Sequence, residues 1–336
     1  MYRILRFFLF LLPPEFAHSV ALKSLLWLHK LKITTWLFPK IPAQTQSIMG
    51  LTFKNSMGIA AGLDKNGDYI DCLASLGVGF IEVGAVTPRP QPGNLKPRLF
   101  RLPKVQALIN RMGFNNKGVD YLVNNLRKRR TDCIVGINLG KNKDTPIAQA
   151  VDDYLICLEK VFPYADFVTI NISSPNTADL RQLQTPEYLE NLLCTLRDKN
   201  IALSQKYQKS LPLLVKIAPD LTQVEVILIA QITERCGFAG IIATNTMLAR
   251  PETIKDYPQS EESGGLSGDP LNAQSREILG WLTAGGYKLN IISVGGISTQ
   301  EEAQQRLAMG ANLLQIYTAI IYKGPYWLYN LIKHLQ

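Results

Sequence analysis

The segment TINISSPNT, residues 169–177, ends a β-type run in two serines, a proline, an asparagine and a threonine. Turn chemistry alone could explain the Ser-Pro-Asn part of this segment. The alternative is a site that uses hydroxyl and amide groups. Which interpretation holds depends on what the rest of the chain places beside these side chains.

Polar residues also follow the other apolar runs of the chain. If these runs are parallel strands of one barrel, their C-terminal ends meet where active sites of such barrels lie. The residues at these ends, in chain order, are Asp64 and Lys65, Ala85 to Thr87, Asn138 and Lys141, Asn171 to Asn176, Lys216, Thr244 and Asn245, Gly295 and Gly296, and Tyr317 and Thr318.

The residue types missing from these ends exclude several chemistries. None of the three histidines (His18, His29 and His334) follows such a run, which argues against histidine acid–base catalysis and a His-bound metal. Asp64 and Asp220 form no close pair, which disfavours glycoside hydrolysis and Mg²⁺-dependent enolisation. The five cysteines are scattered without CxxC spacing, which indicates a reducing cytoplasm, no disulfides and no zinc. We expect no metal, and a site that hydrogen-bonds a planar, polar, anionic ligand.

The last two runs indicate a phosphate. Gly295 and Gly296 allow close backbone approach, and the loops after the seventh and eighth strands often bind phosphate in barrels. The loop GGLSGDP, residues 264–270, adds another small-residue segment. Together with Lys216, which could stabilise the negative charge of a reduced flavin, the pattern favours FMN as the cofactor.

Eight apolar runs alternate with helical segments from residue 55 onward. Continuous apolar strands separated by helices predict a parallel sheet, and eight units in about 250 residues fit a closed (β/α)₈ TIM barrel of the α/β class. A doubly wound open sheet is the alternative. The runs are 56–62, 80–87, 133–140, 167–174, 213–220, 240–246, 291–297 and 313–319, and the helical candidates are 116–130, 145–162, 186–207, 222–236, 272–284 and 299–309.

Residues 1–40 are predicted to form a separate helical unit before a barrel of residues 41–336. The net charge of +9 is concentrated near the N-terminus, where Glu15 is the one acid before Asp64. Two helices with exposed aromatic and basic residues favour docking on an anionic membrane surface over nucleic acid. The run ILRFFLFLL is too short to span a bilayer. A signal peptide and a simple cap on the barrel are the competing interpretations.

Several long motifs resemble the dihydroorotate dehydrogenase family, and specifically its class 2, the membrane-associated, quinone-dependent type. The resemblance covers essentially the whole chain. The motifs are MGLTFKNSMGIAAGLDKNG (49–67), VTPRPQPGN (86–94), PRLFRL (97–102), INRMGFNN (109–116), GINLGKNKDT (136–145), NISSPNT (171–177), VKIAPD (215–220), ATNT (243–246), GGLSG (264–268) and VGGI (294–297).

The resemblance implies two sets of binding residues. For FMN they are Ala61, Gly62, Leu63, Asp64, Lys65, Ala85, Asn138, Asn171, Lys216, Thr244, Gly268, Gly296, Tyr317 and Thr318. For the substrate, dihydroorotate, they are Lys65, Asn110, Arg111, Met112, Gly113, Phe114, Asn171, Asn176, Asn245 and Thr246. The substrate's chemistry fits, because asparagines can both donate and accept, and Lys65 or Arg111 can supply charge for the carboxylate. Ala85 departs from the family's usual Thr or Ser, so one side-chain hydroxyl to FMN is lost.

The resemblance also implies roles in catalysis and in electron transfer. Ser174 matches the base of class 2 enzymes, where class 1 enzymes have cysteine, and Thr177 matches a partner for proton exit. A serine is a poor base at its ordinary pKa and needs help from its surroundings. Ser173 is interpreted as structural. The N-terminal unit would form a tunnel for a membrane quinone, lined in part by His18, Arg101 and Tyr317.

The function that we expect is oxidation of dihydroorotate to orotate in pyrimidine biosynthesis, by a monomer at the cytoplasmic face of the inner membrane. A class 1-type or related FMN-dependent pyrimidine oxidoreductase is one alternative. It would lack the N-terminal extension, and a class 1 enzyme would place cysteine at position 174. A non-catalytic membrane flavoprotein is the other alternative.

Overall fold

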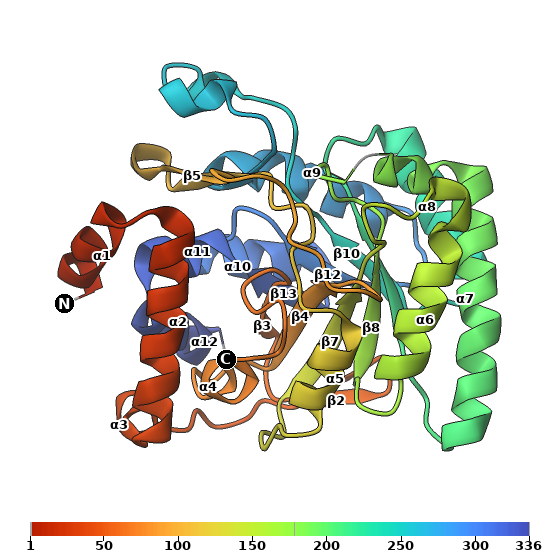
Figure 1. Cartoon of the computed structure of the whole chain (residues 1–336), viewed down its shortest axis with the longest axis horizontal. Coiled ribbons are helices and arrows are strands. Elements are labelled where there is room, and N and C mark those ends of the chain that lie inside the picture. Colours follow the sequence, from red (N-terminus) through yellow and green to blue (C-terminus); the bar gives the residue numbers. More distant parts are fainter. Residues whose placement is uncertain (1, 178, 336) are drawn as a thin grey trace.

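The structure is a computed structural model that describes residues 2–177 and 179–335. Its centre is a closed barrel in which every neighbouring pair of strands is parallel (Figure 1). Each predicted run coincides with one barrel strand, so the (β/α)₈ fold is confirmed and the open sheet is wrong. The strands are β3 (Met57–Ile59), β4 (Phe80–Val86), β7 (Ile134–Leu139), β8 (Phe167–Asn171), β9 (Leu213–Ile217), β10 (Gly240–Ala243), β12 (Asn290–Val294) and β13 (Leu313–Ile316).

Helices surround the barrel, and the six predicted candidates coincide with six of them. Helix ends follow local chemistry: α8 begins after a reciprocal capping box in which Thr222 and Glu225 each accept the other's backbone N–H. The helices after the first strand are α4 (Ile70–Ala74), α5 (Val119–Leu126), α6 (Ala150–Val161), α7 (Pro186–Tyr207), α8 (Gln223–Arg235), α9 (Asn272–Ala284), α10 (Gln300–Ala308), α11 (Thr318–Lys323) and α12 (Pro325–His334). The short α4, α11 and α12 were not among the candidates.

The lower part of the barrel interior is packed with aromatic rings. Phe80 contacts Phe53 and Phe167 edge-on, with ring centroids 5.5 and 6.1 Å apart. Phe53 comes from a hairpin of β1 (Gln46–Ile48) and β2 (Leu51–Phe53). Gly136 leaves room for Phe167, because a Cβ there would lie 2.0 Å from its ring. This end of the barrel is therefore filled, and polar groups are left for the opposite end.

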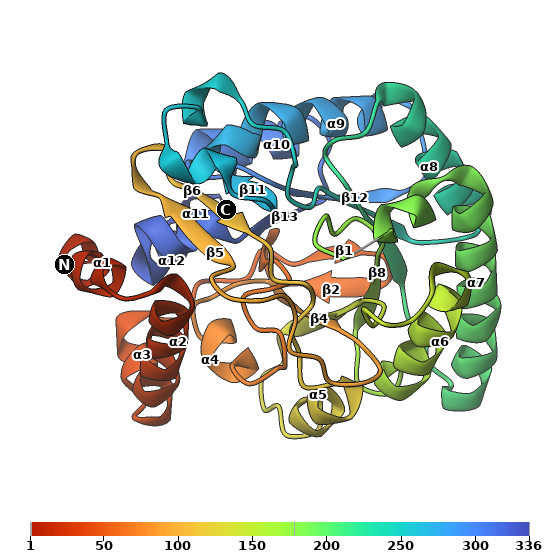
Figure 2. The ribbon, with the colours of Figure 1, turned by 45° about the horizontal axis from the view of Figure 1, so that its top comes forward.

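A second sheet, absent from the sequence-based predictions, contributes to the opposite end. It is antiparallel, with strand order β11 (Gly265–Gly268), β6 (Ala107–Asn110) and β5 (Leu99–Leu102). Figure 2 shows these strands beside one another, near α11. Their residues line the same cavity as the C-terminal ends of the barrel strands.

The N-terminal segment forms three helices, not the two predicted: α1 (Tyr2–Leu11), α2 (Pro14–Lys30) and α3 (Ile33–Leu37). The apolar run before the Pro13–Pro14 pair, which the prediction left unassigned, is α1. Both views place these helices at the side of the molecule opposite α6 to α8 (Figures 1 and 2). Among the described residues, no helix combines the length and the hydropathy needed to cross a bilayer.

Candidate active site

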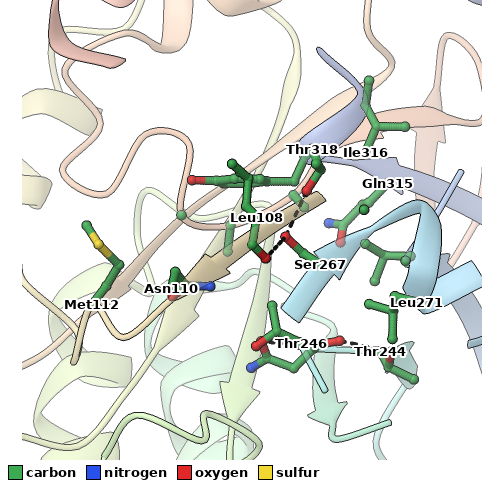
Figure 3. Close-up of a pocket in the computed structure, with 18 of the residues that line it drawn as sticks. Leu108, Asn110, Met112, Thr244, Thr246, Ser267, Leu271, Gln315, Ile316 and Thr318 are labelled. Atoms are coloured by element: carbon green, nitrogen blue, oxygen red, sulfur yellow. Dashed lines mark hydrogen bonds between the residues drawn. The ribbon is translucent and has the colours of Figure 1, made fainter. Parts of the chain in front are cut away.

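One cavity lies where the C-terminal ends of the barrel strands meet the β5–β6–β11 sheet. Figure 3 shows residues of both around it, including Asn110 and Met112 from the second sheet and its following loop, and Thr244 and Thr246 after β10. Ser267 of β11 is hydrogen-bonded to the Thr318 hydroxyl, 2.9 Å away, and donates to the Leu108 carbonyl at 3.4 Å. The second sheet is thus tied to the start of α11, just after the last barrel strand, at the wall of the cavity.

Most of the residues predicted to hold the cofactor line this cavity. Those that do are Ala61, Gly62, Lys65, Ala85, Asn171, Lys216, Thr244, Gly268, Gly296, Tyr317 and Thr318. Leu63, Asp64 and Asn138 do not. The Asp64 carboxylate is buried and accepts the backbone N–H groups of Asn66, Asp68 and Tyr69, so it shapes the loop after β3. Burial raises the pKa of Asp64 to about 6, against the lowering effect of these hydrogen bonds.

The residues predicted to hold the substrate line the same cavity, with one exception. Lys65, Asn110, Met112, Gly113, Phe114, Asn171, Asn176, Asn245 and Thr246 line it. Arg111 does not: its guanidinium is paired with Glu262 at 2.5 Å and lies over the Phe100 ring. Of the two cations considered for a carboxylate, the structure brings Lys65 to the cavity and leaves Arg111 engaged elsewhere.

The asparagines around the cavity hold one another in place. Asn171 donates to Asn138 Oδ1 at 2.9 Å, and Asn176 donates to Asn110 Oδ1 at 3.3 Å. Asn245 donates to the Ser173 hydroxyl at 3.0 Å. Since a primary amide has two N–H donors and an acceptor oxygen, each residue keeps capacity for a ligand. The arrangement suits a ring that carries both N–H and carbonyl groups.

Ser174 lines the cavity, while its neighbour Ser173 faces the protein. The Ser174 Oγ accepts the backbone N–H of Asn176 at 3.3 Å, and its own proton has no acceptor among the described residues. Ser173 Oγ donates to Asn171 Oδ1 at 3.1 Å, which fits the structural role expected for it. The Thr177 hydroxyl is buried, also without a partner in the described part of the chain. Of the two serines, Ser174 is thus the one placed to meet a ligand.

Arg181 fixes the loop that carries Ser174, and the sequence analysis did not single it out. It donates to the Ser173 and Thr246 carbonyls, both at 3.2 Å, and pairs with Asp220 at 2.9 Å. These contacts join the loops that follow β8, β9 and β10.

A buried acid below the cavity was also missed. Glu82, on β4, is fully buried and is 3.4 Å from the Lys216 ammonium. Asn138 and Gln315 donate to its carboxylate at 2.7 and 2.9 Å. Burial would raise the pKa of Glu82, but Lys216 and the Asn138 and Gln315 donors outweigh burial and lower it.

The cavity has one group that suits the N–H of a flavin ring and two glycines that suit close approach of its phosphate. The Oε1 atom of Gln315, a lining residue, is buried and has no partner among the described residues, as expected of an atom that meets a donor on a ligand. Gly268 and Gly296 have positive φ angles of 99° and 70°, and a Cβ would lie within 2.6 Å of the backbone of Gln106 or Asn272. Only glycine therefore lets the chain pass this close. The buried Arg306 donates to the Gly295 carbonyl and steadies the loop.

Of the three residues assigned to a quinone tunnel, Tyr317 lines the cavity, whereas His18 and Arg101 do not. Burial, reinforced by the charge of Lys65, lowers the pKa of His18 to about 4 in spite of a hydrogen bond to the Leu63 backbone. His18 is thus neutral at pH 7 and lies beside the loop after β3. Arg101 donates to the Phe10 and Leu12 carbonyls and covers the Phe10 ring at 4.4 Å. Its charge is directed to the α1–α2 junction.

Comparison with known proteins identifies relatives over the whole chain. The family model described as dihydroorotate dehydrogenase matches residues 43–336. A protein named dihydroorotate dehydrogenase (quinone) from Klebsiella pneumoniae (strain 342) is 50% identical over 335 residues, which are 99% of this chain and 99% of the relative. One of the same name from Coxiella burnetii (strain Dugway 5J108-111) is 49% identical over 336 residues, 100% of this chain and 96% of the relative.

A solved structure agrees with the fold. The crystal structure of DHODH in complex with ferulenol from Eimeria tenella superposes with a TM-score of 0.85 at 37% identity, covering 96% of this chain and 90% of that one. The bacterial relatives match the N-terminal helices as well as the barrel, which the family model alone does not.

Proposed function

The chain belongs to the dihydroorotate dehydrogenase family, and from this we infer that it oxidises dihydroorotate to orotate in pyrimidine biosynthesis and passes the electrons to a quinone. The observation that carries the proposal is the convergence of Ser174, several asparagines and two lysines on one cavity. We propose FMN as the cofactor, held against Lys216, Gln315 and the Gly295–Gly296 loop. When bound, it supplies the acceptor for the hydride that leaves C6 of the substrate.

The residues of the chain would supply binding and proton transfer. The amides of Asn110, Asn176 and Asn245 pair with the ring N–H and carbonyl groups of dihydroorotate, and Lys65 pairs with its carboxylate. This orients C5 towards Ser174 Oγ, which takes the C5 proton. The Ser174 proton and the Thr177 hydroxyl have no partner among the described residues, which supports this role, because a proton accepted at Oγ needs a polar route out of a buried site.

A steady-state assay with two electron acceptors tests the proposal. We expect dihydroorotate-dependent reduction of a short-chain quinone, and little reduction of fumarate. Fumarate reduction at a rate comparable to that of quinone reduction would favour the class 1-type enzyme. If neither acceptor is reduced, the non-catalytic membrane flavoprotein is favoured. The serine at position 174 and the three N-terminal helices support the quinone-dependent type.

We propose that α1 to α3 dock the protein peripherally on the cytoplasmic face of the inner membrane. Phe7, Phe8, Trp27 and Trp36 are exposed by 60 to 80% of their surface, far more than a helix packed as a barrel cap would leave. Arg3 and several lysines of this segment accompany them, which suits anionic lipid.

Lys65 should make substrate binding dependent on pH. Burial lowers the pKa of Lys65 to about 8, although the charge of Glu15 opposes the shift. The ammonium is therefore charged below pH 8 and loses its proton above it. We expect the Kd of orotate, measured by titration of the holoenzyme, to be flat below pH 8 and to rise up to tenfold per pH unit above pH 8.

Lys65→Gln is the control for this pH dependence. The substitution should weaken orotate binding at every pH and remove the increase in the Kd above pH 8. If the Kd of the variant still increases above pH 8 as in the wild type, a group other than Lys65 causes the pH dependence.

A further inference from the structure

Glu82 places a negative charge in the barrel interior, next to the cavity but outside it. Its carboxylate has partners from several strands: Asn138 on β7, Lys216 on β9, Gln315 on β13 and the backbone N–H of Ala61, 3.3 Å away, after β3. Lys216, Gln315 and Ala61 all line the cavity. The acid is therefore connected to three residues of the cavity lining through single hydrogen bonds.

The Glu82–Lys216 pair is the one ion pair with both side chains in the barrel interior, among the described residues. The Lys216 side chain is 6% exposed and that of Glu82 is not exposed. A buried pair of this kind usually adds little net stability, since desolvation offsets the attraction. Removing one partner leaves the other charge uncompensated in a medium of low dielectric constant, where its effect on nearby groups is large.

We propose that Glu82 holds the Lys216 ammonium at the cavity floor and, by its own negative charge, offsets part of the effect of that ammonium on the reduction potential of the bound flavin. This inference rests on the proposed function. A lysine ammonium next to the flavin stabilises the negative charge gained on reduction and raises the potential. The Glu82 carboxylate cancels part of that field. The potential is thereby kept low enough for a quinone to reoxidise the cofactor.

The test is the flavin reduction potential of full-length holoenzyme, measured by equilibrium titration against reference dyes. Glu82→Gln keeps the size and one acceptor oxygen and removes the charge. We expect the two-electron equilibrium to move towards reduced flavin by at least tenfold, a rise of about 30 mV in potential. A purely structural ion pair predicts lower thermal stability with an unchanged potential.

Two control variants separate charge from packing. Glu82→Asp keeps the charge and should recover most of the wild-type potential. Thr233→Val removes a fully buried hydroxyl from α8, away from Glu82 and the cavity, without changing any charge, and should leave the potential unchanged. A rise with Thr233→Val as large as that with Glu82→Gln would overturn the inference.

A second pair of variants keeps the test decisive if Glu82→Gln does not fold. Lys216→Met and the double variant Lys216→Met/Glu82→Gln, studied with excess FMN at a pH where Glu82 is ionised in the single variant, differ by the same single charge, and the double variant buries no unpaired ion. The double variant should have the higher potential, whereas equal potentials would overturn the inference. A wild-type protein that binds no flavin would instead contradict the proposed function.

Discussion

Ser174→Ala should purify with its flavin and reduce it about 10²- to 10⁴-fold more slowly than the wild-type protein when dihydroorotate is added. The range is that of general acid–base catalysis by a positioned side chain. Flavin content should be unchanged, because the substitution removes one hydroxyl and leaves in place Lys216, Gln315 and the Gly295–Gly296 loop, which are proposed to hold the cofactor. The measurement is anaerobic stopped-flow absorption at saturating dihydroorotate.

Two further variants separate the base from its surroundings. Ser174→Cys should recover part of the rate, with a pH profile displaced to lower pH, since a thiol ordinarily has a pKa of about 8.5. Ser173→Ala removes the neighbouring hydroxyl, which hydrogen-bonds Asn171 and Asn245. It should raise KM more than it lowers kcat. Equal rates of flavin reduction in Ser174→Ala and wild type would refute the assignment of the base.

Deletion of residues 1–40 should remove binding to vesicles that contain anionic lipid and impair quinone turnover, while flavin reduction by dihydroorotate is largely retained. Burial of one large apolar side chain contributes roughly 1.5–3 kcal/mol, so loss of several predicts a drop in partitioning of about 100-fold or more. Co-sedimentation with vesicles measures this. If the full-length and shortened proteins partition equally, the membrane proposal fails.

The structure also calls for a milder variant. The deletion removes Glu15, which pairs with the buried Arg98 at 2.9 Å, and so leaves a charge without its partner. Phe7→Ser/Phe8→Ser changes two exposed rings of α1 and keeps that pair. It should weaken vesicle binding about tenfold or more. Ile201→Ser, an exposed apolar site on α7, should not.

The barrel was predictable because its strands are continuous apolar runs, buried on both faces and separated by helices. The site followed from the same pattern, since a closed parallel barrel brings the residues after each strand to one end. The β5–β6–β11 sheet was missed because its strands have four residues each and its β11–β6 pairing joins residues more than 150 positions apart. Helix α1 was missed because its apolar run was judged only by its length and by the proline pair after it.

The direction and role of a side chain were harder to predict where they depend on partners that are distant in the sequence. Arg111 is paired with Glu262, 151 residues away, so its neighbours in the sequence say nothing of its direction. Glu82 is a single acid within an apolar strand, and its role depends on donors from three other strands. The positions of Ser174 and Lys65 followed more directly, because each comes soon after its own strand.

The central claim is that the amides, lysines and Ser174 around this cavity serve a flavin that dihydroorotate reduces. The most direct measurement is the anaerobic visible absorption spectrum of the purified full-length protein before and after dihydroorotate, and again after a quinone is added. We predict a flavin spectrum that bleaches with the first addition and returns with the second. A protein without flavin absorption, or a flavin that dihydroorotate does not bleach, would contradict it.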